Sequence, residues 1–156
     1  MTNLNIMENI YLLPNRYHLI GWILVIIFLP LGLWHLFGNF EFSFLEVEIP
    51  WREEGDFFLP KKENFSNELF ALGTLFGLVF ISLARLKEED EFTKMVRLKS
   101  WHFAMLLYTF SLIIAIVFFY DVDFIVALAF CIYLPFVFFY IRFRLFMRSL
   151  NRQLSE

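Results

Sequence analysis

The stretch Tyr17–Gly38 reads YHLIGWILVIIFLPLGLWHLFG and contains no Asp, Glu, Lys or Arg. At a rise of about 1.5 Å per residue, a helix of this length can cross a hydrocarbon core of about 30 Å. A signal peptide would need a basic segment, a shorter apolar core and a small-residue cleavage site, whereas Met1–Asn15 carries only one charged residue, Glu8. The stretch therefore predicts a retained transmembrane helix.

Three further apolar blocks follow, at residues 66–86, 100–120 and 124–141. The sequence is 60% hydrophobic and has 23 Phe among its 156 residues, which is more apolar surface than a soluble domain of this size can bury. The length is that of one ordinary domain. We therefore predict a single all-α integral membrane domain over residues 1–156, a bundle of four transmembrane helices without a separate soluble module.

The basic residues indicate the orientation, because Lys and Arg are retained on the cytoplasmic side during insertion. Ten of the 13 Lys and Arg residues lie before residue 17, at Arg85 and in the loop 87–99, and in the tail 142–156. The loop 39–65 holds the other three, Arg52, Lys61 and Lys62, among many Glu residues. We expect a multi-pass protein of the bacterial inner membrane with both termini cytoplasmic and the loop 39–65 outside.

Short-range signals suggest how the helices meet. The turn Asp121-Val122-Asp123 would make spans three and four antiparallel neighbours. Pro30 and Pro135 lie inside spans one and four, where each removes a backbone hydrogen bond and bends the helix.

Small residues predict a close contact between helices. Gly73 and Gly77 form a G-x-x-x-G pattern on span two, which lets another backbone approach closely. Ser111 and Ala115 repeat the small-residue spacing on span three, so an internal contact between these two helices is favoured over a dimer seam.

The outer loop carries an alternating pattern. Phe40, Phe42 and Phe44, and then Val47, Ile49 and Trp51, alternate with polar residues in the manner of a half-buried strand. The pattern is compatible with a small extracytoplasmic cap, with a segment lying on the membrane surface, or with an edge offered to a partner.

The cytoplasmic loop is longer than a tight helix connection needs. Read as a helix, it places Asp90 and Lys94 four residues apart in the favourable order for an ion pair. The segment would present a charged surface to a partner, or it is a solvated turn closed by local ion pairs. The partner-binding candidates are Glu88, Glu89, Asp90, Glu91, Phe92, Lys94 and Arg97.

This acidic run, followed by Phe92 and then by Arg97-Leu98-Lys99-Ser100 at the head of a span, resembles a pattern in small uncharacterised bacterial four-helix membrane proteins. The resemblance covers about Arg85 to Tyr108. Genes of that group often lie beside helix-turn-helix regulators, so the resemblance implies a regulatory or membrane-sensing role. It supplies no active site.

Other polar residues are candidates for binding a lipid, a metal, haem b or a proton. The tail residues Arg142, Arg144 and Arg148 would attract anionic lipid headgroups. His18 and His102, at the cytoplasmic ends of spans one and three, could together ligate a metal or haem b. On the outer side, His35 and Glu68 form a polar pair suited to a proton or a ligand, although Glu68 is equally explained as a charge at a helix start.

The sequence contains no H-E-x-x-H, G-x-S-x-G, phosphate-binding glycine loop or paired intramembrane carboxylate, and Cys131 is the only cysteine. We therefore predict a non-enzymatic adaptor, sensor or regulatory subunit without catalytic residues, resident metal or cofactor. Its expected partners are membrane lipids and a membrane or cytoplasmic protein or a second copy, without direct contact to nucleic acid. The alternatives are a haem- or metal-binding redox or sensor bundle using His18 and His102, and an oligomeric channel or small-solute carrier.

Overall fold

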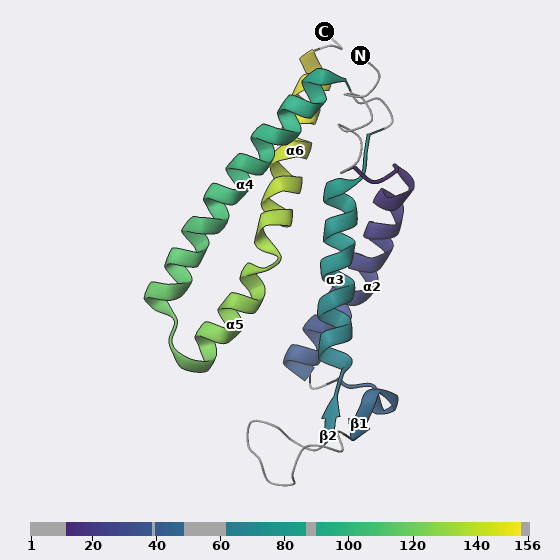
Figure 1. Ribbon diagram of the computed structural model, residues 1–156, viewed down its shortest axis with the longest axis vertical. Coiled ribbons are helices and arrows are strands. Elements are labelled where there is room, and N and C mark those ends of the chain that lie inside the picture. Colours follow the sequence, from purple (N-terminus) through teal and green to yellow (C-terminus); the bar gives the residue numbers. More distant parts are fainter. Residues whose placement is uncertain (1–11, 39, 49–61, 87–89, 154–156) are drawn as a thin grey trace, which may run out of the picture. The chain divides into compact units, whose positions relative to one another are not determined.

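The computed structural model describes residues 12–38, 40–48, 62–86 and 90–153 (Figure 1). Most of these residues are helical. The helices are α2 (Arg16–Gly38), α3 (Ser66–Leu83), α4 (Glu91–Phe118), α5 (Asp121–Cys131) and α6 (Leu134–Gln153), with a 3-10 turn η1 (Ser43–Leu45) and two strands, β1 (Glu46–Glu48) and β2 (Lys62–Asn64).

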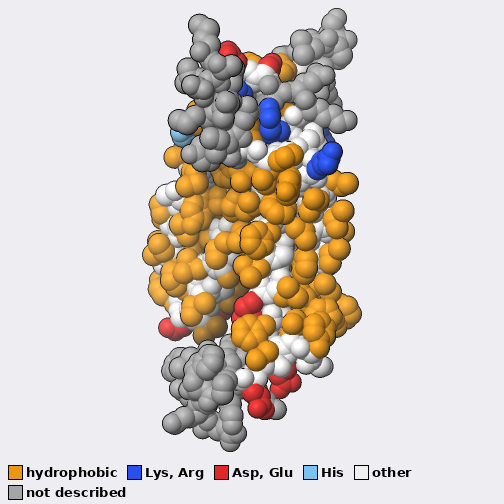
Figure 2. Space-filling model, turned by 45° about the vertical axis from the view of Figure 1, so that its right-hand side comes forward, with side chains coloured by type: hydrophobic (Ala, Val, Ile, Leu, Met, Phe, Trp, Pro, Cys, Tyr) orange, Lys and Arg blue, Asp and Glu red, His pale blue; other side chains and the backbone are white. Residues whose placement is uncertain are grey.

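Four segments are long and apolar enough to cross a membrane, as predicted: α2, α3, α4 and the joined stretch of α5 and α6, Asp121–Leu150. Large hydrophobic side chains remain exposed along them, for example Leu106 at 71% and Phe118 at 71%. Figure 2 shows hydrophobic side chains over most of the visible described surface. The helices therefore expose the kind of surface that a hydrocarbon solvent accepts.

The chain divides into two units, each with its own packing. Gly21–Gly77 forms one unit, and Met1–Ile20 with Leu78–Glu156 forms the other. In the first, β1 and β2 pair antiparallel, with Val47 opposite Glu63. A strand is thus confirmed at residues 46–48, but all three of its side chains are exposed, so the predicted half-buried face is not found there. Residues 43–45 form η1, and Ile49 and Trp51 lie outside the described residues.

The second unit has its core between α4 and α6, which run side by side in opposite directions (Figure 1). Trp101 of α4 stacks on Phe139 of α6 with ring centroids 4.4 Å apart, and Phe139 stacks on Phe143 at 5.6 Å. The buried core residues are Val96, Ala104, Phe139 and Phe143. This core extends over the part of α4 that precedes its apolar span.

Several predicted boundaries are corrected. The first span is confirmed almost to the residue, with Pro30 inside continuous helix. The second ends at Leu83 instead of residue 86, because Ala84 and Arg85 leave the helix to pair with Leu13. The third begins at Glu91 instead of residue 100, because the charged segment before it is helical.

The connection between spans three and four also differs from the prediction. The chain reverses at Phe119 and Tyr120, and Asp121, with a φ of 50°, already begins α5. Asp is one of the few residues that accept this backbone conformation, and carboxylates at a helix start are stabilised by its free N–H groups. The predicted turn at residues 121–123 is therefore wrong.

The bend predicted in the fourth span is a break between two helices. α5 ends at Cys131, and α6 begins at Leu134, one residue before Pro135. Pro135 has no N–H to donate to the carbonyl of Cys131, which explains why the helix breaks here. Beyond residue 141 the predicted tail continues as α6 to Gln153.

Candidate functional site

The start of α4 is fixed by Asp90. Its carboxylate accepts a hydrogen bond from the backbone N–H of Thr93 at 2.8 Å. Hydrogen bonds from Thr93, first from its side chain and then from its backbone, lower the pKa of the Asp90 carboxyl because they stabilise the charged form. The i, i+4 spacing in the sequence predicts only a pairing of Asp90 with Lys94, whereas in the structure Asp90 is the N-cap of α4.

The segment from Glu91 to Lys99 presents one exposed face. The side chains of Phe92, Met95 and Leu98 are 41%, 51% and 59% exposed. Glu91 and Lys99 are also exposed at the two ends of this surface. We call the surface made by Glu91, Phe92, Met95, Leu98 and Lys99 the Phe92 face. Of the other predicted partner-binding residues, Glu88 and Glu89 lie outside the described residues.

Arg97, on the opposite side of the same helix, is only 8% exposed. Its Nη1 donates to the carbonyl oxygen of Ser82 at 2.9 Å, and its Nη2 donates to that of Ala84 at 3.2 Å. The guanidinium carbon lies 4.9 Å from the ring centroid of Phe143. Arg97 therefore caps the carboxyl end of α3 and is not part of the exposed surface that we expected to meet a partner.

Leu13, which precedes α2, also bonds to the backbone at the carboxyl end of α3. The N–H of Leu13 donates to the carbonyl of Leu83 at 2.9 Å, and the N–H of Arg85 donates to the carbonyl of Leu13 at 2.8 Å. This bridge was not predicted. Its only signal in the sequence is the pair of leucines, Leu12 and Leu13, that precedes Pro14 outside the apolar block. We call the assembly of Leu13, Ser82, Ala84, Arg97 and Phe143 the Arg97 junction.

Gly73 and Gly77 do mark a close helix contact. A Cβ at Gly77 would lie 2.9 Å from the carbonyl oxygen of Gly21 and 2.8 Å from Cγ2 of Val25, and one at Gly73 would collide with the ring of Phe28. The neighbour that the structure gives to both glycines is thus α2, whereas the sequence analysis favoured the third span.

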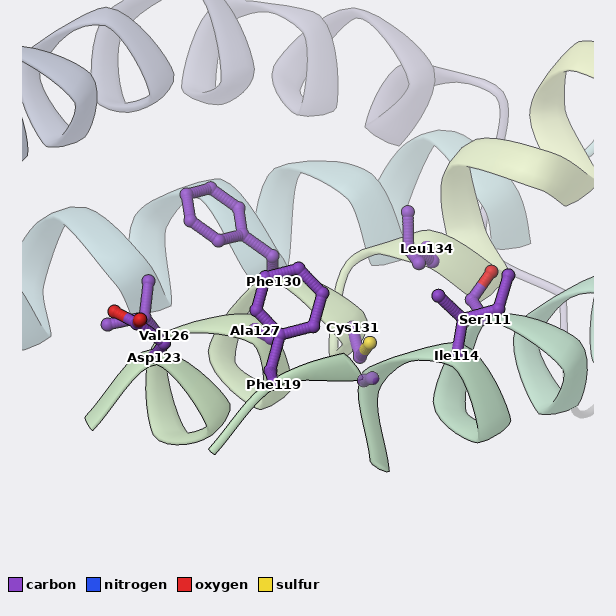
Figure 3. A pocket seen from close by; sticks show the side chains of 10 residues that line it. Ser111, Ile114, Phe119, Asp123, Val126, Ala127, Phe130, Cys131 and Leu134 are labelled. Atoms are coloured by element: carbon purple, nitrogen blue, oxygen red, sulfur yellow. The ribbon is translucent and has the colours of Figure 1, made fainter. Parts of the chain in front are cut away.

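Ser111 and Ala115 line an open groove between α4 and α5 with a volume of about 460 Å³. Figure 3 shows Asp123 at one end of this groove, Ser111 and Leu134 at the other, and Cys131 between them. Its walls are mostly apolar. The remaining lining residues are Ile114, Phe119, Val126, Ala127 and Phe130.

His35 and Glu68, the predicted polar pair, each have a different structural explanation. Nδ1 of His35 lies 2.7 Å from the carbonyl oxygen of Phe40, and its imidazole packs edge-on against Phe70. Glu68 is exposed in the first turn of α3. The His35 ring is therefore held by the outer end of its own unit, and Glu68 occupies the position where a helix start favours negative charge.

The two histidines considered for haem or metal both belong to the second unit. His18 is half-buried near the start of α2, and His102 is exposed on α4. Among residues 12–38, 40–48, 62–86 and 90–153, no three His, Cys, Asp or Glu side chains are grouped to hold a metal ion.

The three arginines predicted to attract lipid headgroups have different surroundings on α6. The guanidinium carbon of Arg142 lies 4.0 Å from the ring centroid of Phe103 on α4. Nε of Arg144 donates to the hydroxyl of Tyr140 at 3.0 Å. Arg148 is exposed.

The chain matches no family model, no curated protein and no solved structure.

Proposed function

We propose that this chain is an integral protein of the bacterial inner membrane, with both termini cytoplasmic, that acts as a non-enzymatic adaptor or regulatory subunit through the Phe92 face. The membrane assignment is supported by four apolar segments with exposed hydrophobic side chains. The orientation is supported by the basic residues, which are concentrated before the first span, before the third and after the fourth.

The observation that carries the adaptor role is the extension of α4 beyond its apolar part. Residues 91–100 contain Glu91, Lys94, Arg97 and Lys99, whereas the apolar stretch begins at Trp101. At about 1.5 Å per residue, the extension reaches about 15 Å beyond the hydrocarbon. It therefore carries the Phe92 face into the aqueous side or the headgroup region.

The chemistry of the Phe92 face suits a protein partner. Phe92, Met95 and Leu98 supply exposed apolar area, and Glu91 and Lys99 supply charge of both signs at its ends. Protein interfaces have this combination of an apolar centre, enriched in aromatic residues and Met, and a polar rim. The resemblance of this segment to membrane proteins encoded beside regulators suggests that the partner is a cytoplasmic or membrane protein of a regulatory system.

The extension is also held in place by contacts with its own unit. A docking element that is already ordered avoids the entropy cost of becoming ordered when a partner binds. On its buried side, Arg97 binds two carbonyls at the end of α3, and Val96 belongs to the core with α6. The exposed side can therefore change without loss of the core.

The test compares two added charges at the same end of the molecule. We expect Leu98→Glu, in the Phe92 face, to abolish stoichiometric co-purification of a protein partner from the native host. Ser149→Glu, on the exposed surface of α6, serves as the matched control and should retain the partner. Circular dichroism and size-exclusion profiles establish that both variants fold. A Leu98→Glu variant that retains every partner would contradict the adaptor role of this face.

A further inference from the structure

A second groove lies between α4 and α6, with a volume of about 460 Å³. It is lined by apolar side chains and one cation. The lining residues are Phe103, Leu107, Phe138, Ile141, Arg142, Leu145 and Phe146, which we call the Arg142 groove. Ligand sites in proteins have volumes of about 300–1,000 Å³ and combine apolar walls with a few polar groups.

Arg142 is the polar group of this groove. Its guanidinium lies over the face of the Phe103 ring, with the central carbon 4.0 Å from the ring centroid. A guanidinium over a ring face is held by cation–π attraction, which supplies no oxygen acceptor to its five N–H donors. Within the described ranges, no acceptor of the protein bonds or pairs with Arg142.

The position of Arg142 along α6 matters as well. Apolar residues 134–141 precede it, and basic residues follow, so Arg142 stands where the apolar part of the fourth span ends. In a bilayer this is the level of the lipid phosphates. On the facing helix, Lys99 lies one turn before Phe103 on the same side of α4 and is exposed. A second positive charge is therefore available at the same end of the groove.

We propose that the Arg142 groove binds one anionic phospholipid, with its phosphate at the guanidinium of Arg142 and one acyl chain along Leu107 and Phe138 toward the bilayer centre. Charge complementarity selects this ligand, because a half-buried arginine that has no acceptor among the described residues and an adjoining apolar channel match a phosphate joined to an acyl chain. The inference rests on the proposed membrane insertion but is independent of the adaptor role.

The test uses the full chain, purified in detergent and stripped of lipid, in a native mass spectrometry titration. The two probes are phosphatidylglycerol and phosphatidylcholine with identical acyl chains. We expect a one-to-one adduct with phosphatidylglycerol at concentrations where phosphatidylcholine gives none. Equal binding of the two lipids would overturn the proposal, because the groove would then not select a net negative charge.

Two variants locate the lipid. Arg142→Gln should weaken phosphatidylglycerol binding roughly tenfold or more, because charge-assisted hydrogen bonds are lost. The matched control Arg148→Gln removes an exposed charge outside the groove and should change binding less than twofold. Equal weakening by Arg142→Gln and Arg148→Gln would mean that diffuse charge attracts the lipid, which overturns the proposal.

The Leu107→Trp variant tests the apolar part of the proposed site, where the acyl chain would lie. It fills the groove and leaves every charge in place. This variant should also weaken binding of phosphatidylglycerol, and unchanged binding would overturn the groove as the site. Thermal unfolding without lipid identifies any variant that fails to fold. Flotation of native membranes tests whether the chain is inserted in a membrane. The Leu98→Glu variant, which tests the adaptor role, should bind the lipid as the wild type does. Failure of the lipid site is thereby distinguished from failure of the proposed function.

Discussion

Arg97 donates a hydrogen bond to the carbonyl oxygen of Ser82 at 2.9 Å across two helices that are consecutive in the chain. Ser82 is 1% exposed, and Arg97 also bonds the carbonyl of Ala84. The last carbonyls of a helix need partners that the helix itself cannot supply. A charged side chain thus acts as a structural element of the fold at this place.

Replacement of Arg97 should destabilise the protein. We expect Arg97→Gln to lower the free energy of unfolding by about 2–4 kcal/mol, because buried carbonyls lose charge-assisted hydrogen bonds and the packing on Phe143 is lost. Arg144→Gln, which changes an exposed arginine, should cost less than about 1 kcal/mol. Denaturant titration in detergent, followed by circular dichroism, measures both. Equal stability of the two variants would exclude an anchoring role for Arg97.

The cap at Asp90 predicts a dependence on pH. The pKa of this carboxyl is lowered from about 3.8, so the cap is fully formed above that value and is lost as the pH falls through the lowered pKa. We expect the amide of Thr93 to be protected from hydrogen exchange, relative to an uncapped amide, from pH 7 down to about pH 4 and to lose this protection below it.

Two variants separate the cap from the charge at Asp90. Asp90→Ala should remove the protection of the Thr93 amide at every pH. Asp90→Asn retains a side-chain oxygen acceptor and should keep the protection while abolishing its loss in acid. Protection that is the same in Asp90→Ala and in the wild type would rule out the cap.

The glycines of α3 predict a loss of stability on addition of a single methyl group. Gly77→Ala should be destabilising by about 1–3 kcal/mol, since the new Cβ would lie 2.9 Å from a backbone oxygen of Gly21. Gly73→Ala should be destabilising as well, because its Cβ would collide with Cγ of Phe28, a ring atom bonded to that residue's own Cβ, which rotation of the ring does not move.

The matched control is Gly32→Ala in α2, where the new Cβ would make an ordinary contact of 3.5 Å with Phe70. It should leave stability nearly unchanged. The three variants are compared by unfolding in a denaturing detergent series. A larger loss at Gly32 than at Gly77 would show that helix propensity, and not the close approach of α2, governs these positions.

The proposed orientation can be measured with single cysteines in a chain whose Cys131 is replaced by Ser. We expect a cysteine at Ser149 to react with a membrane-impermeant maleimide only in inverted vesicles. A cysteine at Ser43 should react in intact cells with a permeabilised outer membrane. Reversed labelling would require both termini to be outside, and the Phe92 face would then lie on the wrong side for a cytoplasmic partner.

The sequence predicted those parts of the fold that depend on long runs of one residue class. The predicted span Tyr17–Gly38 differs from α2 by only one residue, because the absence of charge over such a length is a strong signal of an apolar helix. The end of α3 was misplaced because Ala84 and Arg85 are apolar or basic residues typical of a span end. Only the pairing with Leu13, distant in sequence, removes them from the helix.

The candidate site was less predictable, because its important contacts join different elements. In sequence, Arg97 is one of several charges in a polar segment, and nothing local distinguishes it from the exposed Lys99. Its burial depends on the carbonyls of Ser82 and Ala84, which are visible only in three dimensions. Asp121 was misassigned for another reason: Asp favours both a turn and a helix start, so the residue type alone does not decide between them.

The bridge between Leu13 and Ala84 has a consequence for biosynthesis. Leu13 is synthesised long before its partners, so its N–H and carbonyl stay without these bonds until α2, α3 and Arg85 have been added to the chain. Arg97 is added later still, and until then the carbonyls of Ser82 and Ala84 lack its guanidinium as a partner. The order of synthesis therefore means that the Arg97 junction can form only after both α2 and α3 have been synthesised.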